Sequence, residues 1–287
     1  MSGPSILAGL LGANISGSLS PVLHESEARA QGFALVYRII DGAVVPTVRQ
    51  SWSEALRRAA DLGYDALNVT VPAKQAVLEA LDEIAPDAAA LGAVNTVLFR
   101  EGRMIGHNTD HAGFVDGLRA NVPGADLSRV VQVGAGGAGS AVAYGVLREG
   151  AGALTVADLD LDRAEALAAR MRAHFPAAGI RATDLGAVVG EIAQATGLVN
   201  TTPVGMEGHI PGSPVPLESL HDGLWVADAV YKPRVTELIG RARELGCRTA
   251  DGGGMIVGQA ARSFTLFTGR EADPRRMADT FDRATAG

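Results

Sequence analysis

The fold expected of this chain is decided by the stretch Val130-Val131-Gln132-Val133-Gly134-Ala135-Gly136-Gly137-Ala138-Gly139. A short apolar run leads into a complete G-x-G-x-x-G string, and a helical pattern follows it. In such a turn the first glycine allows a tight bend, the second lets backbone approach a diphosphate, and the third lets the helix pack closely on the strand. The sequence therefore predicts a dinucleotide site with contacts at Gly134, Ala135, Gly136, Gly137, Ala138 and Gly139, although chance or tight packing alone can produce such a string.

An acidic residue stands where such a site needs one. Asp158 closes an apolar run nineteen residues after Gly139, and its carboxylate can accept hydrogen bonds from both hydroxyls of an adenosine ribose. Asp160 adds a second negative charge, and no Lys or Arg follows before Arg163, so a 2′-phosphate would meet repulsion. The pattern predicts NAD rather than NADP as the cofactor. An alternative role for Asp158 is to cap the helix that begins near Asp162, a task that Asp160 could also perform.

The composition narrows the class of protein. With 287 residues, 47% of them hydrophobic, 36 glycines and 5% aromatics, the chain suits helices packed closely on sheets rather than a β-sandwich or a disordered chain. The net charge of −7 and the scattered distribution of 25 Lys and Arg predict no nucleic-acid partner. Cys247 is the only cysteine and the six histidines show no ligand spacing, so we expect neither a disulfide nor a metal site.

The sequence also predicts where the protein works. A single cysteine favours a reducing compartment, and no Lys or Arg precedes Arg29, so the apolar start lacks the charged segment of a secretory signal. The uncharged run from Val130 to Leu147 is long enough for a membrane-spanning helix, but its five glycines favour a strand followed by a turn and a helix. We expect a cytoplasmic protein with no membrane partner, present as a monomer or a homodimer.

The first third of the chain alternates short apolar runs with helical patterns, which is a βαβ rhythm. Strands are predicted at residues 6–11, 35–40 and 67–71, and helices at residues 21–31, 46–62 and 73–84. Residues 94–99 and 104–106 flank the turn Arg100-Glu101-Gly102-Arg103 and indicate a hairpin added to the same sheet.

A second α/β series begins with a helix at residues 110–121. Strands are predicted at residues 130–133, 154–158, 197–200 and 224–228, with a helix at residues 162–175 and two closing helices at residues 255–267 and 274–283. We therefore predict an α/β fold of two domains. Residues 1–110 form a substrate-binding and catalytic domain, residues 111–250 a Rossmann-type doubly wound parallel sheet, and residues 251–287 helices that return to the first domain.

Several strings in the chain resemble motifs of the shikimate dehydrogenase family. They are Ser16-Gly17-Ser18-Leu19-Ser20-Pro21, Asn68-Val69-Thr70-Val71-Pro72-Ala73-Lys74, Gly92-Ala93-Val94-Asn95-Thr96, Gly106-His107-Asn108-Thr109-Asp110, Asn200-Thr201-Thr202-Pro203-Val204-Gly205-Met206, Asp228-Ala229-Val230-Tyr231-Lys232-Pro233 and Gly254-Met255-Ile256-Val257-Gly258-Gln259-Ala260. The resemblance covers essentially the whole chain. It implies a nicotinamide-dependent dehydrogenase that oxidises the 3-hydroxyl of shikimate, quinate or both.

The resemblance also assigns roles to residues. It implies that Ser18 and Ser20 bind the substrate carboxylate, a role that short hydroxyls beside helix-start N–H groups can fill. Lys74 and Asp110 would form the acid–base pair. Asn68, Thr70, Asn95, Tyr231 and Gln259 would complete the substrate site, and Thr201, Thr202, Pro203, Met206, Val230 and Gly254 the cofactor site.

Purely structural roles also remain open for the same residues. Ser18 and Ser20 could be ordinary loop and capping residues. Asn68 and Asn95 stand in or beside apolar strands, where an unpaired amide is costly, so each needs a partner that could be backbone rather than substrate. A lone lysine on a helix, such as Lys74, is most often a solvated surface residue.

The chain departs from the common family pattern at its cofactor end. NADP-using members typically carry an Asn-Arg-Thr-like string where this chain has Asp158-Leu159-Asp160, so it resembles the NAD-dependent quinate/shikimate branch. The Ser18-Leu19-Ser20 anchor is instead similar to that of shikimate-preferring members, and the choice between the two acids stays open. The alternatives are an NADP-dependent shikimate or aminoshikimate dehydrogenase and a non-catalytic NAD-binding regulator.

Overall fold

The structure is a computed structural model that describes residues 5–285, and its chain divides into two compact units. Unit 1 comprises the residues up to Thr109 together with those from Gln259 onward, and unit 2 comprises Asp110–Gly258. The chain passes from unit 2 back to unit 1 within one helix, α11 (Gly252–Thr268).

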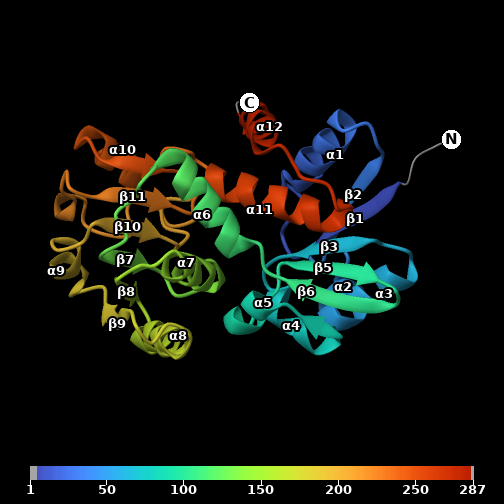
Figure 1. Cartoon of the computed structure of the whole chain (residues 1–287), viewed down its shortest axis with the longest axis horizontal. Helices are drawn as coiled ribbons and strands as arrows, with labels where there is room; N and C mark the ends of the chain where they lie inside the picture. Colours follow the sequence, from blue (N-terminus) through green and yellow to red (C-terminus); the bar gives the residue numbers. More distant parts are fainter. Residues whose placement is uncertain (1–4, 286–287) are drawn as a thin grey trace. The chain divides into compact units, whose positions relative to one another are not determined.

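Unit 2 contains a six-stranded sheet in the order β12-β11-β10-β7-β8-β9, and every pair in it is parallel (Figure 1). Its strands are β7 (Val130–Val133), β8 (Ala153–Asp158), β9 (Gly179–Asp184), β10 (Gly197–Asn200), β11 (Trp225–Asp228) and β12 (Arg248–Ala250). The strand order reverses direction between β7 and β10, which is where doubly wound sheets bind their ligands. The prediction of a Rossmann-type sheet is confirmed.

Helices cover both faces of this sheet, because its strands are apolar on both sides. Along β7, Val130 belongs to one buried cluster with Val142 and Leu167, whereas Val131 belongs to another with Leu238. The helices of unit 2 are α6 (Asp110–Asn121), α7 (Gly137–Arg148), α8 (Leu161–His174), α9 (Val188–Ile192) and α10 (Glu237–Glu244), with a 3₁₀ turn at Leu217–Ser219.

Unit 1 contains a mixed sheet in the order β2-β1-β3-β5-β6-β4. Its strands are β1 (Ile6–Gly12), β2 (Leu35–Asp41), β3 (Ala66–Val69), β4 (Glu83–Ile84), β5 (Thr96–Arg100) and β6 (Arg103–His107). β1 lies parallel to β2 and β3, while β5 runs antiparallel to β3 and β6. The predicted hairpin is therefore present, and its turn places Glu101 and Gly102 at positive φ.

The helices of unit 1 are α1 (Ser20–Ala30), α2 (Pro46–Gln50), α3 (Trp52–Asp61), α4 (Ala73–Ala76), α5 (Pro86–Leu91), the second part of α11 and α12 (Pro274–Thr285), with a 3₁₀ turn at Leu78–Ala80. The single helix predicted at residues 46–62 is wrong, because Ser51 is extended and its side chain caps α3 by accepting the Glu54 N–H. The helix predicted at residues 73–84 is also wrong, since it ends after one turn and β4 pairs with β6 instead. Tertiary pairing overrides helical periodicity there.

A buried ion pair ties α1 to α12. The Glu27 side chain has no solvent exposure, and both of its oxygens accept from Arg276, with Nε–Oε2 and Nη2–Oε1 distances of 2.7 Å. Burial would raise the pKa of Glu27, but the hydrogen bonds from Arg276, the Asp273 N–H and Gln31 lower it overall. The closing helix is thus fixed to the first helix of the same unit.

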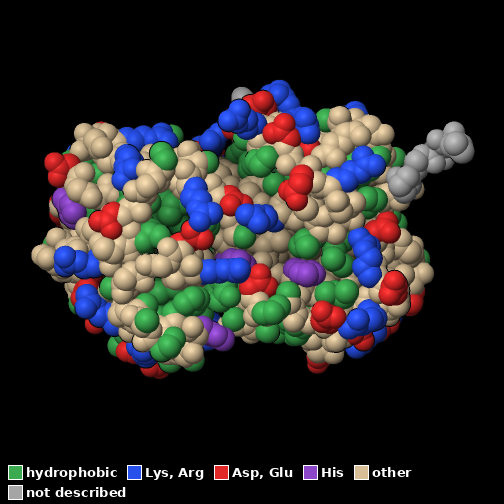
Figure 2. Space-filling view, in the orientation of Figure 1, with side chains coloured by type: hydrophobic (Ala, Val, Ile, Leu, Met, Phe, Trp, Pro, Cys, Tyr) green, Lys and Arg blue, Asp and Glu red, His purple; other side chains and the backbone are tan. Residues whose placement is uncertain are grey.

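Two surface properties complete the description. On the face drawn in Figure 2, Lys and Arg side chains lie interspersed with Asp and Glu rather than gathered into one stripe. None of the helices within residues 5–285 combines the length and the apolar character needed to cross a membrane.

Candidate active site

The glycine-rich turn of unit 2 connects β7 to α7 as predicted. Gly134 has a φ of +104°, and a Cβ there would lie 2.6 Å from the Thr201 hydroxyl oxygen, so neither the backbone nor the space admits a side chain. A Cβ on Gly139 would collide with the Gly134 carbonyl oxygen. By contrast, a Cβ on Gly136 or Gly137 would meet no protein atom within 4 Å. Protein packing therefore explains the outer glycines of the motif and leaves the middle ones unexplained.

Two side chains stabilise this turn by donating hydrogen bonds to its carbonyl oxygens. Gln132 Nε2 donates to the carbonyl oxygens of Gly134 and Gly139 at 2.8 and 2.9 Å, and the Thr201 hydroxyl donates to those of Val133 and Gly134 at 2.9 Å. Gly136 then caps α7 without any side-chain hydrogen bond. The first N–H groups of α7 therefore lie at the start of a helix whose dipole favours an anion.

Asp158 lies at the carboxyl end of β8, beside the turn. Its Oδ2 accepts from the Ala135 N–H at 2.7 Å and its Oδ1 from the Asp160 N–H at 3.0 Å. Each carboxylate oxygen has two lone pairs, so both retain capacity to accept from a ligand hydroxyl. Asp160, not Asp158, caps α8, since its side chain accepts the Arg163 N–H. The alternative role considered for Asp158 is thus filled by Asp160.

Asp228 ties together the loops that follow β10 and β11. Its Oδ1 accepts from Asn200 Nδ2 and the Val230 N–H at 2.9 Å, and its Oδ2 from the Thr236 hydroxyl at 2.7 Å. Burial raises the pKa of Asp228 and nearby Asp251 adds to the rise, against the hydrogen bonds it accepts. These contacts fix the position of the loops that carry the predicted cofactor residues.

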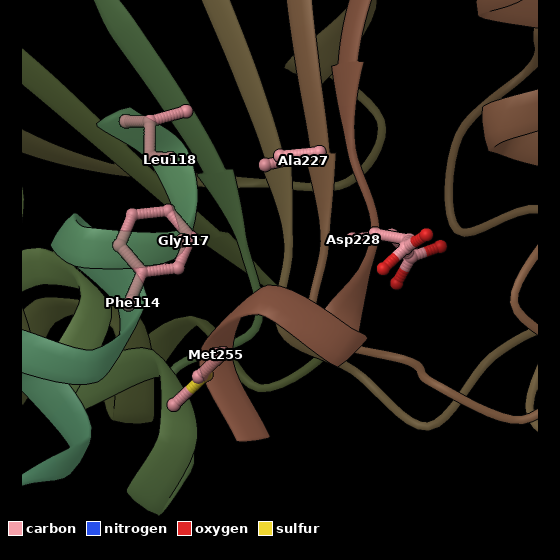
Figure 3. Close-up of a pocket in the computed structure, with 8 residues that line it drawn as sticks. Phe114, Gly117, Leu118, Ala227, Asp228 and Met255 are labelled. Carbon is pink, nitrogen blue, oxygen red and sulfur yellow. The ribbon is translucent and has the colours of Figure 1, made fainter. Parts of the chain in front are cut away.

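Asp228 also borders a small cavity inside unit 2. Figure 3 shows Phe114, Leu118 and Met255 on helices at one side of it and Ala227 and Asp228 on a strand at the other. The cavity has room for about one water-sized group, so it is too small for a substrate.

The remaining residues predicted for the cofactor lie around the same loops. Thr202 donates from its N–H and its hydroxyl to Asn200 Oδ1 at 2.9 and 2.7 Å, and Val230 is buried. A Cβ on Gly254 would lie 3.0 Å from Gly117 Cα, so close packing of α11 on α6 already requires that glycine. Pro203 and Met206 are the other predicted cofactor contacts in these loops. Tyr231, which was predicted to bind the substrate, lies in the loop after β11, and all three residues are at least partly exposed.

In unit 1 the Ser18-Leu19-Ser20 string leads into α1. Leu19 is the N-cap, Ser20 the first helical residue, and the Ser18 hydroxyl lies 3.1 Å from that of Ser20. Asp41 holds the preceding loop by accepting from the Asn14 and Ile15 N–H groups and the Ser16 hydroxyl. Burial would raise the pKa of Asp41, but the hydrogen bonds from Ala43 and from these three groups lower it to about 2. The two half-buried serines therefore stand on a fixed loop at a helix start.

The two predicted asparagines are buried in one polar cluster of unit 1. Asn68 lies in β3 and is 5% exposed, and Asn95 lies just before β5 and is 2% exposed. Asn95 Oδ1 accepts from the Thr109 N–H at 2.8 Å, and its Nδ2 donates to the Thr109 hydroxyl at 2.9 Å. Both amides thus have protein partners, as their burial requires.

The predicted acid–base residues each lie at a helix start. Lys74 is half-buried in α4, the short helix after Pro72, and its carbonyl oxygen accepts from the Val94 N–H at 3.0 Å. Asp110 is 7% exposed and begins α6 in unit 2. Thr70 follows β3, and Gln259 lies in the part of α11 that belongs to unit 1.

Sequence reasoning missed the side chains that support these residues. Tyr37, Thr96, Thr109 and Ser263 surround the asparagines, and Gln132 holds the glycine-rich turn. Thr96 and Thr109 lie in strings that resemble family motifs, but no role was assigned to them. For Gln132 in β7 and Tyr37 in β2 the signal was a polar side chain within a strand. A polar group at such a position needs a partner, but the pattern does not say which one.

Comparison with family models supports both ends of the chain. The model of the shikimate dehydrogenase substrate-binding domain matches residues 10–97, and that of the shikimate 5′-dehydrogenase C-terminal domain matches residues 252–280.

Relatives named as shikimate or quinate/shikimate dehydrogenases resemble nearly the whole chain. It is 50% identical over 277 residues to a shikimate dehydrogenase (NADP(+)) of Streptomyces avermitilis, covering 96% of this chain and 95% of the relative. It is 48% identical over 282 residues to a quinate/shikimate dehydrogenase (NAD(+)) of Corynebacterium efficiens, covering 98% and 99%. The structure of quinate dehydrogenase from Corynebacterium glutamicum in complex with NAD matches with a TM-score of 0.92 and 46% identity, covering 96% of this chain and 98% of that one.

Proposed function

The chain belongs to the shikimate dehydrogenase family, and from that premise we propose that it catalyses the reversible NAD-dependent oxidation of the 3-hydroxyl of shikimate, quinate or both. The observation that supports NAD is the carboxylate of Asp158, which retains lone pairs for ribose hydroxyls beside the start of α7. The exposed side chain that follows it, Leu159, is 86% accessible and offers nothing to a phosphate.

The middle glycines support the same cofactor. Because no protein atom lies near a Cβ on Gly136 or Gly137, and because neither residue has a positive φ, close approach of a bound diphosphate is the reason that remains for glycine at these positions. The uncapped N–H groups of α7 would meet the diphosphate oxygens.

The residues of this chain divide the chemistry between them. NAD held at the glycine-rich turn and Asp158 would supply the hydride acceptor for oxidation of the carbon that carries the 3-hydroxyl. Lys74 would take the hydroxyl proton and return it in the reverse direction, while Asp110 orients the lysine and the hydroxyl. Ser18 and Ser20 would hold the carboxylate, and Asn68, Thr70, Asn95, Tyr231 and Gln259 would hold the rest of the acid.

The proposal extends to the setting in which the enzyme works. We expect a cytoplasmic enzyme with small-molecule substrates, because its one cysteine, Cys247, is buried and in no disulfide and its net charge of −7 does not suit nucleic acid.

The rival is an NADP-dependent shikimate dehydrogenase. It is favoured by the relatives at 50% identity that use NADP and by Arg163, whose Nη1 lies 3.9 Å from Asp158 Oδ1. Arg163 is however 57% exposed and already faces two carboxylates, since its Nη2 lies 3.5 Å from Asp160 Oδ2. A 2′-phosphate would have to displace that arrangement.

Initial rates with both acids and both cofactors test the proposal. We expect kcat/KM to favour NAD over NADP by about 100-fold, which corresponds to roughly 3 kcal/mol for lost hydrogen bonds and added like charge. Asp158→Asn combined with Leu159→Arg should remove much of that preference, because a charge is lost and a guanidinium gained. Arg163→Ala is the matched control and should leave the preference intact. A ratio near one, or one that favours NADP, would reject NAD and support the rival.

A further inference from the structure

The Asn68 amide is held from two sides, and two of the side chains that hold it, Tyr37 and Ser263, lie outside the strings that resemble family motifs. Its Oδ1 accepts from the Tyr37 hydroxyl at 2.7 Å, a contact between β3 and β2. Its Nδ2 lies 3.0 Å from the Ser263 hydroxyl on α11 and 3.1 Å from the Thr96 hydroxyl on β5. It also lies 3.2 Å from the Asn95 carbonyl oxygen. Both amide hydrogens of Asn68 are therefore matched by protein acceptors, and only its oxygen keeps a lone pair to offer.

The Tyr37 hydroxyl links this amide to the predicted carboxylate anchor. The Ser20 side chain lies close enough to the Tyr37 phenol to lower its pKa, and the Ser20 hydroxyl in turn lies 3.1 Å from that of Ser18. Burial raises the pKa of the Tyr37 phenol, which the Ser20 contact offsets only in part, so the phenol keeps its proton. The Tyr37 hydroxyl donates its proton to Asn68, so the phenol lies between the Ser18–Ser20 pair and the amide.

The Ser263 hydroxyl extends the connection to the second asparagine. Ser263 is fully buried, and its oxygen lies 3.0 Å from the Thr96 hydroxyl and 3.1 Å from the Thr109 hydroxyl. Thr109 pairs with both ends of the Asn95 amide. Tyr37 and Ser263 thus stand on opposite sides of Asn68, and all of these residues belong to unit 1.

An aromatic stack holds the Tyr37 ring in place. The ring lies 4.8 Å from the His24 ring with an interplanar angle of 8°, and His24 also contacts Phe264 and Phe267 at centroid distances of 6.2 and 5.3 Å. Tyr37 is 4% exposed and His24 is fully buried. Because the ring cannot tilt without disturbing the stack, the position of its hydroxyl is set by the core.

We propose that Tyr37 is a positioning residue of the substrate site, which fixes the Asn68 amide with Ser263 and thereby joins recognition of the carboxylate to recognition of a ring hydroxyl. The inference rests on the proposed function, since it takes Ser18, Ser20 and Asn68 as substrate ligands. In this arrangement the Asn68 side-chain oxygen accepts a hydrogen bond from a substrate hydroxyl, and the Asn68 amide donates none to the substrate. A preorganised amide loses little freedom when the acid binds.

The test is Tyr37→Phe, which keeps the stack on His24 and removes one hydroxyl. We expect the KM for the acid to rise about 5- to 20-fold, while kcat changes less than about threefold and the KM for NAD does not change. Tyr64→Phe is the matched control in the same unit, and it should leave all three constants within about twofold, since its hydroxyl makes no hydrogen bond within the described residues.

A double-mutant cycle separates positioning from a general loss of structure. In an Asn68→Ala background, Tyr37→Phe should change the KM for the acid by less than about twofold, because the residue through which it acts is gone. Ser263→Ala is a second variant, and we expect it to raise the KM for the acid about 2- to 5-fold. It tests the same positioning of Asn68 if Tyr37→Phe does not fold.

The outcomes distinguish this inference from the function on which it rests. An active wild-type enzyme whose KM is unchanged by Tyr37→Phe, or whose two substitutions act additively in the cycle, would overturn the role of Tyr37 alone. A wild-type chain that turns over neither acid with either cofactor would overturn the proposed function and this inference together.

Discussion

The glycine-rich turn of unit 2 and the polar cluster of unit 1 hold their ligand-binding groups in different ways. Gln132 reaches carbonyl oxygens two and seven residues further along the chain. Asn68 instead takes partners 31 residues away at Tyr37 and 195 residues away at Ser263. The glycine-rich turn is therefore held in part from within its own stretch, with Asp158 and Thr201 as more distant partners, whereas the polar cluster depends almost wholly on residues that unit 1 brings together from afar.

The largest effect that would separate the two regions comes from Lys74→Ala. Loss of the proton acceptor should lower kcat by about 10²- to 10⁴-fold, while the affinity for NAD stays nearly unchanged because the turn and Asp158 are intact. Steady-state rates and NAD titration measure the two quantities. Asp110→Asn should behave similarly, with some loss of substrate binding. A variant of either residue that keeps most of its kcat would remove that residue from the mechanism.

Two glycines of the turn are expected to be glycine for different reasons: Gly139 for close protein packing, and Gly136 for close approach of the cofactor. Gly139→Ala places a Cβ against the Gly134 carbonyl oxygen and should lower the free energy of unfolding of unit 2 by about 1–3 kcal/mol. Gly136→Ala meets open space and should leave stability nearly unchanged, while weakening NAD binding about tenfold or more. Chemical denaturation and NAD titration of both variants provide the measurement.

The two glycine variants serve as controls for each other. If Gly136→Ala binds NAD as the wild type does, the diphosphate does not approach that residue, and the diphosphate site proposed at the turn is wrong. If both variants lose stability alike, protein packing alone accounts for the motif.

The polar cluster should be more sensitive to pH than the turn, because His24 lies behind Tyr37. Burial lowers the pKa of His24 from 6.5 to about 3, and neither of its ring nitrogens has a hydrogen-bond partner within residues 5–285. Between these two values the unfolded chain binds a proton that the folded chain does not. The free energy of unfolding of unit 1 should therefore fall as pH falls below 6.5, by up to about 1.4 kcal/mol per pH unit.

Urea denaturation at pH 6.5, 5.5 and 4.5 measures this dependence, and His24→Phe should reduce its slope because the stack is kept without a titrating group. Burial also lowers the pKa of His107, against the charges of Asp87 and Glu83, so His107→Gln is the control and should reduce the slope less. Equal slopes for the wild type and His24→Phe would show that His24 does not carry the effect.

The same contrast explains how much of the molecule could be predicted. The G-x-G-x-x-G string is complete in the sequence, so β7, the turn and α7 were found together, and the Rossmann-type sheet followed. The pairing of β4 with β6 and the break at Ser51 depend on tertiary contacts and capping geometry, which helical periodicity does not report.

In the candidate site, too, residues within recognisable motifs could be predicted, whereas residues brought together only by the fold could not. Resemblance to family motifs pointed to Asn68, whose surroundings the structure now describes. Tyr37 and Ser263 were not predicted because neither lies in a string that resembles a family motif, and nothing in the sequence says that β2, β3 and α11 meet at their side chains. Local chemistry can be inferred from spacing, whereas a long-range polar network requires the fold.

The smallest expected effect tests whether Ser18 and Ser20, at the start of α1, bind the substrate carboxylate. Ser18 is half-buried, its hydroxyl lies 3.1 Å from that of Ser20, and its oxygen also accepts the Ser20 N–H at 3.2 Å. Because water can replace part of these contacts, Ser18→Ala should raise the KM for the acid only about 5- to 10-fold, near 1 kcal/mol, and change kcat less than about twofold, since a carboxylate is held alike in the ground and transition states. Ser18→Thr keeps the hydroxyl and should restore most of the loss, and Ser26→Ala on the same helix should have no effect. If Ser18→Ala and Ser20→Ala both leave the KM unchanged, the carboxylate binds elsewhere, and Tyr37 would position Asn68 beside a purely structural pair of serines.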